Sequence, residues 1–137
     1  MKAFFDTSAL VKKYIDEPGR VEFDKFIEHV SQIVVAPTYV IEMFGLVNRK
    51  VREKIMTVSD ADRVKNAVLE HYIHFENVIF SVSLQQKAVD LIDRYPLTSL
   101  DAIQLASAAM AGVQTFVTSD KQLFKCAVHE IKNVKLI

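Results

Sequence analysis

Short runs of consecutive apolar residues alternate along the chain with longer stretches whose apolar positions recur three or four residues apart. The short runs indicate buried strands, and the longer stretches indicate amphipathic helices. Strands are expected over residues 2–5, 33–36, 78–82 and 114–118, with a last edge strand over 134–137. Helices are expected over residues 7–16, from about 21 onward, over 38–55, 59–75, 83–95 and 99–112, and after 120.

Hydroxyl side chains stand where several of these helices are expected to begin. Such side chains can accept hydrogen bonds from the first free backbone amides of a helix. Ser59 with Asp62 resembles a capping box, and Pro18-Gly19 marks the end of the first helix. The other expected capping residues are Thr7, Ser8, Thr38, Ser83 and Ser99.

The alternation of strands and helices predicts a parallel sheet that is covered by helices on both faces. The length of 137 residues suggests one domain over residues 1–137, and half of the residues are hydrophobic, which is enough for a substantial core. Gly and Pro occur only three times each, which argues against long linkers.

Charge and cysteine content narrow the classes of protein to which this chain can belong. Lys and Arg together number 17, as do Asp and Glu, so an anionic substrate would need a local basic patch. The lone Cys126 excludes an internal disulfide and a cysteine-rich zinc site. Asp6 interrupts the first apolar run too early for a signal peptide, and no apolar run approaches the ~20 residues of a membrane span. We therefore expect a cytoplasmic protein without a membrane segment.

Four carboxylates stand at or near transitions between expected elements: Asp6, Glu42, Asp101 and Asp120. The carboxyl ends of parallel strands gather at one edge of a sheet, where ligands bind. Oxygen ligands without a matching histidine or cysteine set suggest a hard cation such as Mg²⁺ or Mn²⁺. The cation would relieve the mutual repulsion of the carboxylates and activate a water for attack on a phosphodiester.

The sequence supports the four acids as functional-site residues to different degrees. Asp101 stands in a helix that is apolar nearly all round, where an unpaired charge is costly, although the helix dipole favours a first-turn acid by under ~1 kcal/mol. Asp6 and Asp120 can equally be turn or helix-start residues. Glu42 lies almost opposite the apolar stripe of its helix, as a solvent-exposed side chain would.

Basic residues cluster on the helix that carries Glu42, and Arg49 and Lys50 are the candidates for binding a phosphate-bearing substrate. Arg49 lies on the same side as Glu42, roughly 10 Å along the helix axis, where it can hold a phosphate next to the scissile one. The alternative is a solvated helix face.

The ordered set Asp6-Thr7-Ser8-Ala9-Leu10, Glu42, Leu100-Asp101-Ala102 and Thr118-Ser119-Asp120 resembles PIN-domain proteins. More narrowly, it resembles VapC-type toxins of type II toxin–antitoxin pairs, and the resemblance covers essentially the whole chain.

The resemblance implies a three-layer α/β/α PIN-like domain with a central parallel sheet of four or five strands. It implies an Mg²⁺- or Mn²⁺-dependent endoribonuclease that forms homodimers and is inhibited by a VapB-like antitoxin. The four acids would be catalytic, with Asp6, Asp101 and Asp120 as metal ligands and with Glu42 lining the pocket. The hydroxyls of Ser8 and Thr118 would support them.

One position departs from the family pattern. Gln122 and Leu123 stand where many relatives carry a further acid. The remaining set is compatible with one tightly held ion, or with a second ion that arrives with the RNA phosphate.

Other functions remain open at this point. A catalytically weak PIN domain would serve as an RNA- or protein-binding module. An aspartyl phosphatase would need a second Asp two residues after Asp6, where the chain has Ser8. A receiver domain would need an Asp after the middle strand, but residues 78–82 lead into Ser83.

Overall fold

The computed structural model describes residues 1–137 and contains a five-stranded sheet in the order β3-β2-β1-β4-β5. All four neighbouring pairs of strands are parallel. The chain builds one half of the sheet outward from β1 and then crosses over to build the other half from β4. The strands are β1 (Lys2–Phe5), β2 (Gln32–Val35), β3 (Glu76–Asn77), β4 (Thr115–Thr118) and β5 (Val134–Leu136).

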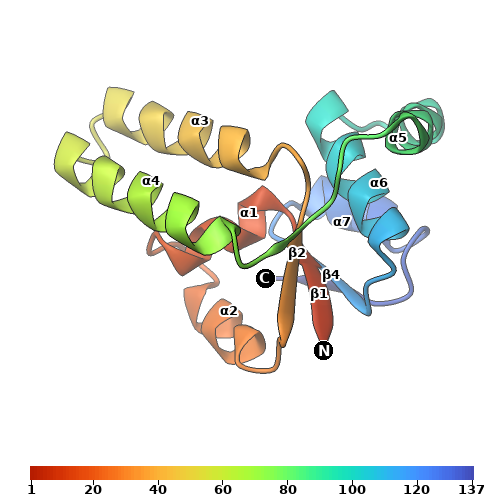
Figure 1. The fold of residues 1–137 in the computed structure, drawn as a ribbon, viewed down its shortest axis with the longest axis horizontal. Helices are drawn as coiled ribbons and strands as arrows, with labels where there is room; N and C mark the ends of the chain where they lie inside the picture. The colour runs from red at the N-terminus through yellow and green to blue at the C-terminus, as the bar shows by residue number, and fades with distance from the viewer.

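Helices cover both faces of the sheet, so the three-layer α/β/α architecture is confirmed and the sheet has five strands (Figure 1). One face carries α1 (Thr7–Leu10), the 3₁₀ helix η1 (Val11–Lys13), α2 (Arg20–Ile27), α3 (Tyr39–Arg52) and α4 (Val58–Tyr72). The other face carries α5 (Val82–Arg94), α6 (Ser99–Ala111) and α7 (Lys121–Ala127). Figure 1 shows α3 and α4 packed side by side as an arm that extends from the sheet.

The central strands contribute side chains to two separate hydrophobic cores. Phe5 belongs to the core under α1–α4, whereas Phe4 belongs to the core under α5–α7, where its ring stacks on Phe116 with centroids 5.6 Å apart. Successive residues of a strand point to opposite faces. Strands that are buried on both faces therefore appear in the sequence as continuous apolar runs, which is why they were predictable.

The third strand differs from the prediction. Only Glu76 and Asn77 pair with β2, and the apolar run that follows them is not a strand. Ile79 is 81% exposed and Phe80 is 53% exposed, while Val82 already begins α5. β2 ends at Val35, and of the apolar run only Val78 still contacts it, through its amide and the Val35 carbonyl oxygen at 3.0 Å.

Several helix starts also differ from the prediction by one or two residues. The residue that caps a helix is the extended one whose side-chain oxygen accepts the amide three positions further on. The observed capping residues are Asp6, Thr57, Ser81 and Thr98, in place of Thr7 or Ser8, Ser59, Ser83 and Ser99.

Helix ends differ as well. The first helix tightens into η1 and ends at Lys13 rather than at residue 16, and α3 ends at Arg52 rather than at residue 55. Lys54 lies just beyond α3 with a left-handed φ of 58°, which reverses the chain toward α4. None of the helices is both long enough and apolar enough to cross a membrane.

Candidate active site

A pocket of about 680 Å³ opens beside the carboxyl ends of β1 and β4, where the strand order reverses. This position agrees with the general rule that ligands of parallel sheets bind at such a reversal. The four predicted acids all line this pocket, although they come from four separate parts of the chain. The other polar lining residues are Thr7, Ser8, Thr38, Arg49, Arg52 and Gln104.

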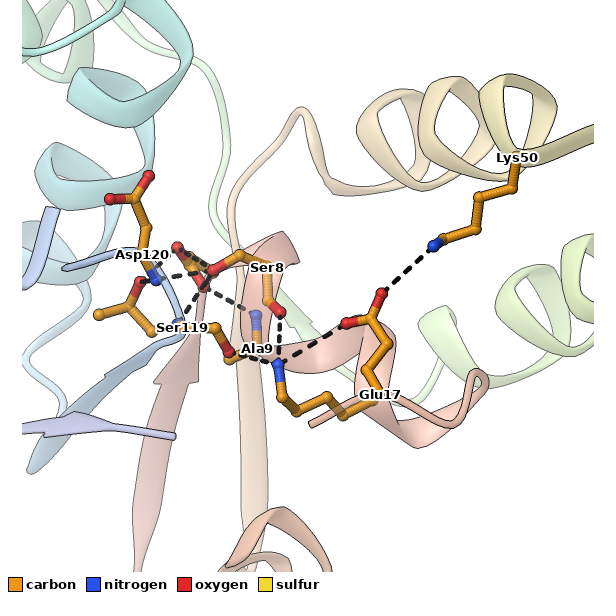
Figure 2. A network of polar contacts seen from close by, with 9 residues as sticks. Ser8, Ala9, Glu17, Lys50, Ser119 and Asp120 are labelled. Carbon is orange, nitrogen blue, oxygen red and sulfur yellow. Dashed lines mark hydrogen bonds and ion pairs between the residues drawn. The ribbon is translucent and has the colours of Figure 1, made fainter. Parts of the chain in front are cut away.

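Asp6 is the most deeply buried of the four acids, with only 3% of its surface exposed. Its carboxylate accepts hydrogen bonds from the Ser8 hydroxyl at 2.8 and 2.9 Å, from Thr118 Oγ1 at 2.7 Å and from the Ala9 amide at 3.0 Å (Figure 2). Burial nevertheless raises the pKa of Asp6 to about 7. The protonated form of this carboxyl is therefore favoured below about pH 7.

Asp120 follows β4 and caps α7 with one of its two oxygens. Oδ1 accepts hydrogen bonds from the amides of Gln122 at 2.8 Å and Leu123 at 3.0 Å, which leaves Oδ2 without a protein partner. The amide of Asp120 donates to Thr118 Oγ1 at 3.0 Å, and the same hydroxyl donates to Asp6. Thr118 therefore links the two acids that follow neighbouring strands.

Asp101 lies in the first turn of α6, where its amide donates to Thr98 Oγ1 at 3.2 Å. Burial raises the pKa of Asp101, and the negative charge of Asp120 raises it further. The charge of Asp101 in turn contributes to the raised pKa values of Asp6 and Glu42. The negative charges of neighbouring carboxyl groups in the pocket therefore act on one another.

Glu42 is half-buried, so the helical-stripe prediction that it is solvent-exposed was wrong. Its Oε2 atom accepts two hydrogen bonds of 2.6 Å, one from Thr38 Oγ1 and one from Gln104 Nε2. Burial raises the pKa of Glu42, although both hydrogen bonds act in the opposite direction. The side chain points away from the core beneath α3, but a second wall formed by α6 encloses it.

Gln104 is a site residue that sequence reasoning missed. It is only 2% exposed, and its Nε2 atom donates to Thr7 Oγ1 at 3.1 Å as well as to Glu42. Its Oε1 atom is buried without a hydrogen-bond partner. The signal in the sequence was a single amide side chain within the mostly apolar helix α6, because buried polar side chains are seldom placed without a partner.

The two predicted basic residues are placed differently. Arg49 lines the pocket on α3, with its side chain 60% exposed and 4.0 Å from the Glu53 carboxylate. Lys50 does not line the pocket, because its ammonium turns toward Glu17 at 3.5 Å. Arg52, from the same basic cluster on α3, joins Arg49 in the pocket wall.

The donor set fits a hard divalent cation by its chemistry, because four carboxylates with no histidine or cysteine among them converge on one pocket. No three acidic, histidine or cysteine side chains are arranged to hold one ion together. Water would therefore complete most of the coordination, as is usual for Mg²⁺ bound through one or two carboxylates.

Comparison with known proteins identifies the family of the chain. A family model described as PIN domain matches residues 3–128. No curated protein matches the chain.

Solved structures share the fold at low sequence identity. A toxin–antitoxin complex from Klebsiella pneumoniae is 20% identical with a TM-score of 0.67, covering 89% of this chain and 89% of that chain. VapBC2 from Rickettsia felis, bound to a DNA fragment from its promoter, is 12% identical with a TM-score of 0.68, covering 100% and 99%. VapC20 from Mycobacterium tuberculosis, described as a sarcin–ricin loop cleaving toxin, is 16% identical with a TM-score of 0.67, covering 88% and 92%.

The family match extends over most of the chain, and it includes all four acids of the pocket. The solved structures agree with it in fold along nearly their full length. The chain therefore belongs to the PIN-domain family.

Proposed function

We propose that this protein is an Mg²⁺- or Mn²⁺-dependent endoribonuclease, the toxin of a VapBC-type toxin–antitoxin pair. The observation that carries the proposal is the convergence of four carboxylates from distant parts of the chain on one pocket that also contains two arginines. The structural similarity to toxin–antitoxin proteins, one of them an RNA-cleaving toxin, supports the same class of activity.

We assign two roles to the carboxylates, namely cation binding and proton transfer. Asp6, Asp101 and Asp120 would hold the cation, one or two of them directly and the others through bound water. The cation supplies Lewis acidity and an activated water when bound. The hydroxyls of Ser8 and Thr118 keep the Asp6 carboxylate in one orientation through hydrogen bonds of 2.7–2.9 Å.

Glu42 is the carboxylate that we assign to proton transfer. Thr38 and Gln104 both bind its Oε2 atom, so Oε1 is left without a protein partner. Its pKa is raised by burial, which brings it closer to the range in which a general base works near neutral pH.

Arg49 and Arg52 would bind RNA phosphates beside the scissile one. Both line the pocket, and a guanidinium can donate two parallel hydrogen bonds to a phosphate. The antitoxin partner and the homodimer follow from the family resemblance, and a small VapB-like protein that covers the pocket would control the nuclease.

Cleavage of a mixed structured RNA by the purified protein tests the proposal. We expect cutting with Mn²⁺ or Mg²⁺, none with EDTA, and none by Asp101→Asn. The matched control is Asp93→Asn, which removes an exposed carboxylate of α5 outside the pocket. Cutting that survives both EDTA and Asp101→Asn would contradict the proposal, because a contaminating nuclease would then explain it.

One observation favours a second function, that of a PIN domain which binds RNA or protein without cutting. The acidic side chains do not form a ready-made cage for a single ion. Under this alternative, RNA binding would persist in EDTA and would be the same for wild type and Asp101→Asn.

A further inference from the structure

Lys12 is a buried ammonium group behind the acidic pocket. Only 4% of its side chain is exposed, and it is not among the residues that line the pocket. Its Nζ atom donates to Ser119 Oγ at 2.6 Å and to the Ser8 carbonyl oxygen at 3.4 Å (Figure 2). The nearest carboxylate is that of Glu17, at 3.7 Å. The charge is therefore buried among the residues that support the site.

Packing alone does not explain a lysine at this position. Withdrawing an ammonium from water is costly, and an apolar side chain of similar volume often serves stability equally well. The chain also makes special room for it. Gly19 has a φ of +93°, and a Cβ atom there would lie 2.9 Å from Lys12 Cε and 3.1 Å from the carbonyl carbon of Ile137. The loop before α2 can close over the lysine stem only because residue 19 is glycine.

Of the two residues that Lys12 binds, Ser8 also holds Asp6 in place, and Ser119 binds Ser8. The Ser119 amide donates to Ser8 Oγ at 3.0 Å, and Ser8 Oγ donates to both oxygens of Asp6. Ser119 directly precedes Asp120. Lys12 therefore fastens the segment after β4 to the first turn after β1, and an acid of the pocket stands in each of these two segments.

The network continues to the helix that carries Glu42. Glu17 lies between two ammonium groups, with Lys12 at 3.7 Å and Lys50 at 3.5 Å. Figure 2 shows this chain of contacts from Ser8 and Ser119 through Glu17 to Lys50 on α3. Glu17 thus compensates the buried charge and ties α3 to the same cluster.

We propose that Lys12 is a positioning residue, which locks the β4–α7 segment onto α1 so that Asp6 and Asp120 keep the relative placement that cation binding needs. The proposal rests on the function proposed above. Lys12 does not itself line the pocket, and it acts only through Ser8 and Ser119.

The test compares Lys12→Met with Lys13→Met. Methionine nearly matches the volume of lysine, and Glu17 keeps Lys50 as its partner, so Lys12→Met leaves no carboxylate stranded. Lys13→Met removes the same charge one residue further on, from a side chain that forms no hydrogen bond or ion pair.

We expect Lys12→Met to weaken Mn²⁺ binding, measured by calorimetry, by about tenfold or more, because groups that orient metal ligands typically have effects of this size. The rate constant kcat for RNA cleavage should fall similarly while KM stays unchanged, and the melting temperature in EDTA should stay close to that of wild type. Without metal, the Ser119 amide should exchange its hydrogen faster in Lys12→Met. Lys13→Met should match wild type in every measurement.

Equal Mn²⁺ affinity and equal Ser119 exchange in Lys12→Met and Lys13→Met would overturn the proposal. If Lys12→Met does not fold, Ser119→Ala takes its place, since it removes only the hydroxyl that Lys12 binds, and wild-type behaviour of that variant would overturn the proposal. If wild type neither binds Mn²⁺ nor cuts RNA, the proposed nuclease function fails, and the Ser119 exchange rate still decides whether Lys12 holds the two segments together.

Discussion

Gln104 Nε2 lies 2.6 Å from Glu42 Oε2, a contact between α6 and α3 that joins the two helices on either side of the acidic pocket. The contact keeps the Glu42 carboxylate inside the pocket. It also favours the ionised form of Glu42 in a place where burial disfavours it.

Gln104→Leu should therefore impair the active site more than the fold. The substitution removes the donor to Glu42 together with the unpartnered Oε1 atom, so the free energy of unfolding should change by no more than about 1–2 kcal/mol. The pKa of Glu42 should rise, and the acid limb of the pH profile of kcat should move to higher pH. Gln122→Leu, an exposed glutamine, is the control. An unchanged pH profile in Gln104→Leu would contradict the role of the contact.

Asp6 should make the metal-free protein less stable as the pH rises. Burial raises its pKa from the ordinary 3.8 to about 7, so the folded state keeps a proton that the unfolded state has already lost. The stabilisation that this proton provides is complete below the unfolded pKa and disappears as the pH rises through about 7. Chemical denaturation in EDTA at several pH values measures it.

Asp6→Asn is the comparison for this pH dependence. Because the amide cannot ionise, the loss of stability between pH 4 and 7 should be smaller in the variant by a few kcal/mol. If the free energy of unfolding depends on pH in the same way in wild type and Asp6→Asn, Asp6 ionises normally in the folded protein.

Divalent cations should stabilise the protein, and more strongly at higher pH. Binding only to the folded state adds about 2.7 kcal/mol at a free concentration one hundred times the Kd. The carboxylates must lose their protons to bind a cation, so the rise in Tm with Mn²⁺ should be larger at pH 8 than at pH 5.5. Asp101→Asn should show a much smaller rise at both pH values. An equal rise in wild type and variant would place cation binding elsewhere.

Arg49→Gln and Arg52→Gln should each weaken RNA binding and reduce its dependence on salt. Each arginine that binds a phosphate contributes close to one unit to the slope of log K against log salt concentration. Arg63→Gln serves as the control, since this exposed arginine pairs with Asp60 on α4 outside the pocket. Fluorescence anisotropy with a labelled RNA at several salt concentrations measures the slopes. Identical slopes for Arg49→Gln and Arg63→Gln would show that Arg49 does not bind an RNA phosphate.

Four of the five strands and two of the acids were predictable, because they depend on local sequence, whereas the third strand was not. Phe4 and Phe5 are buried on opposite faces of the sheet, so the strand is an unbroken apolar run that ends at a polar residue, Asp6. Asp120 follows β4 for the same reason. Helix starts were less predictable, because several hydroxyls stand close together and only the backbone conformation decides which of them becomes the cap.

The sequence by itself determined the order of the elements, the parallel sheet and the acids that follow β1 and β4. Only the tertiary structure decided that Glu42 is enclosed, that Lys50 turns from the pocket to Glu17, and that Lys12 is buried behind Asp6. The periodicity of a helix identifies the side that faces its own core, but it carries no information about a second wall. Burial and pairing of a charge depend on groups that are distant along the chain, and folding alone brings them together.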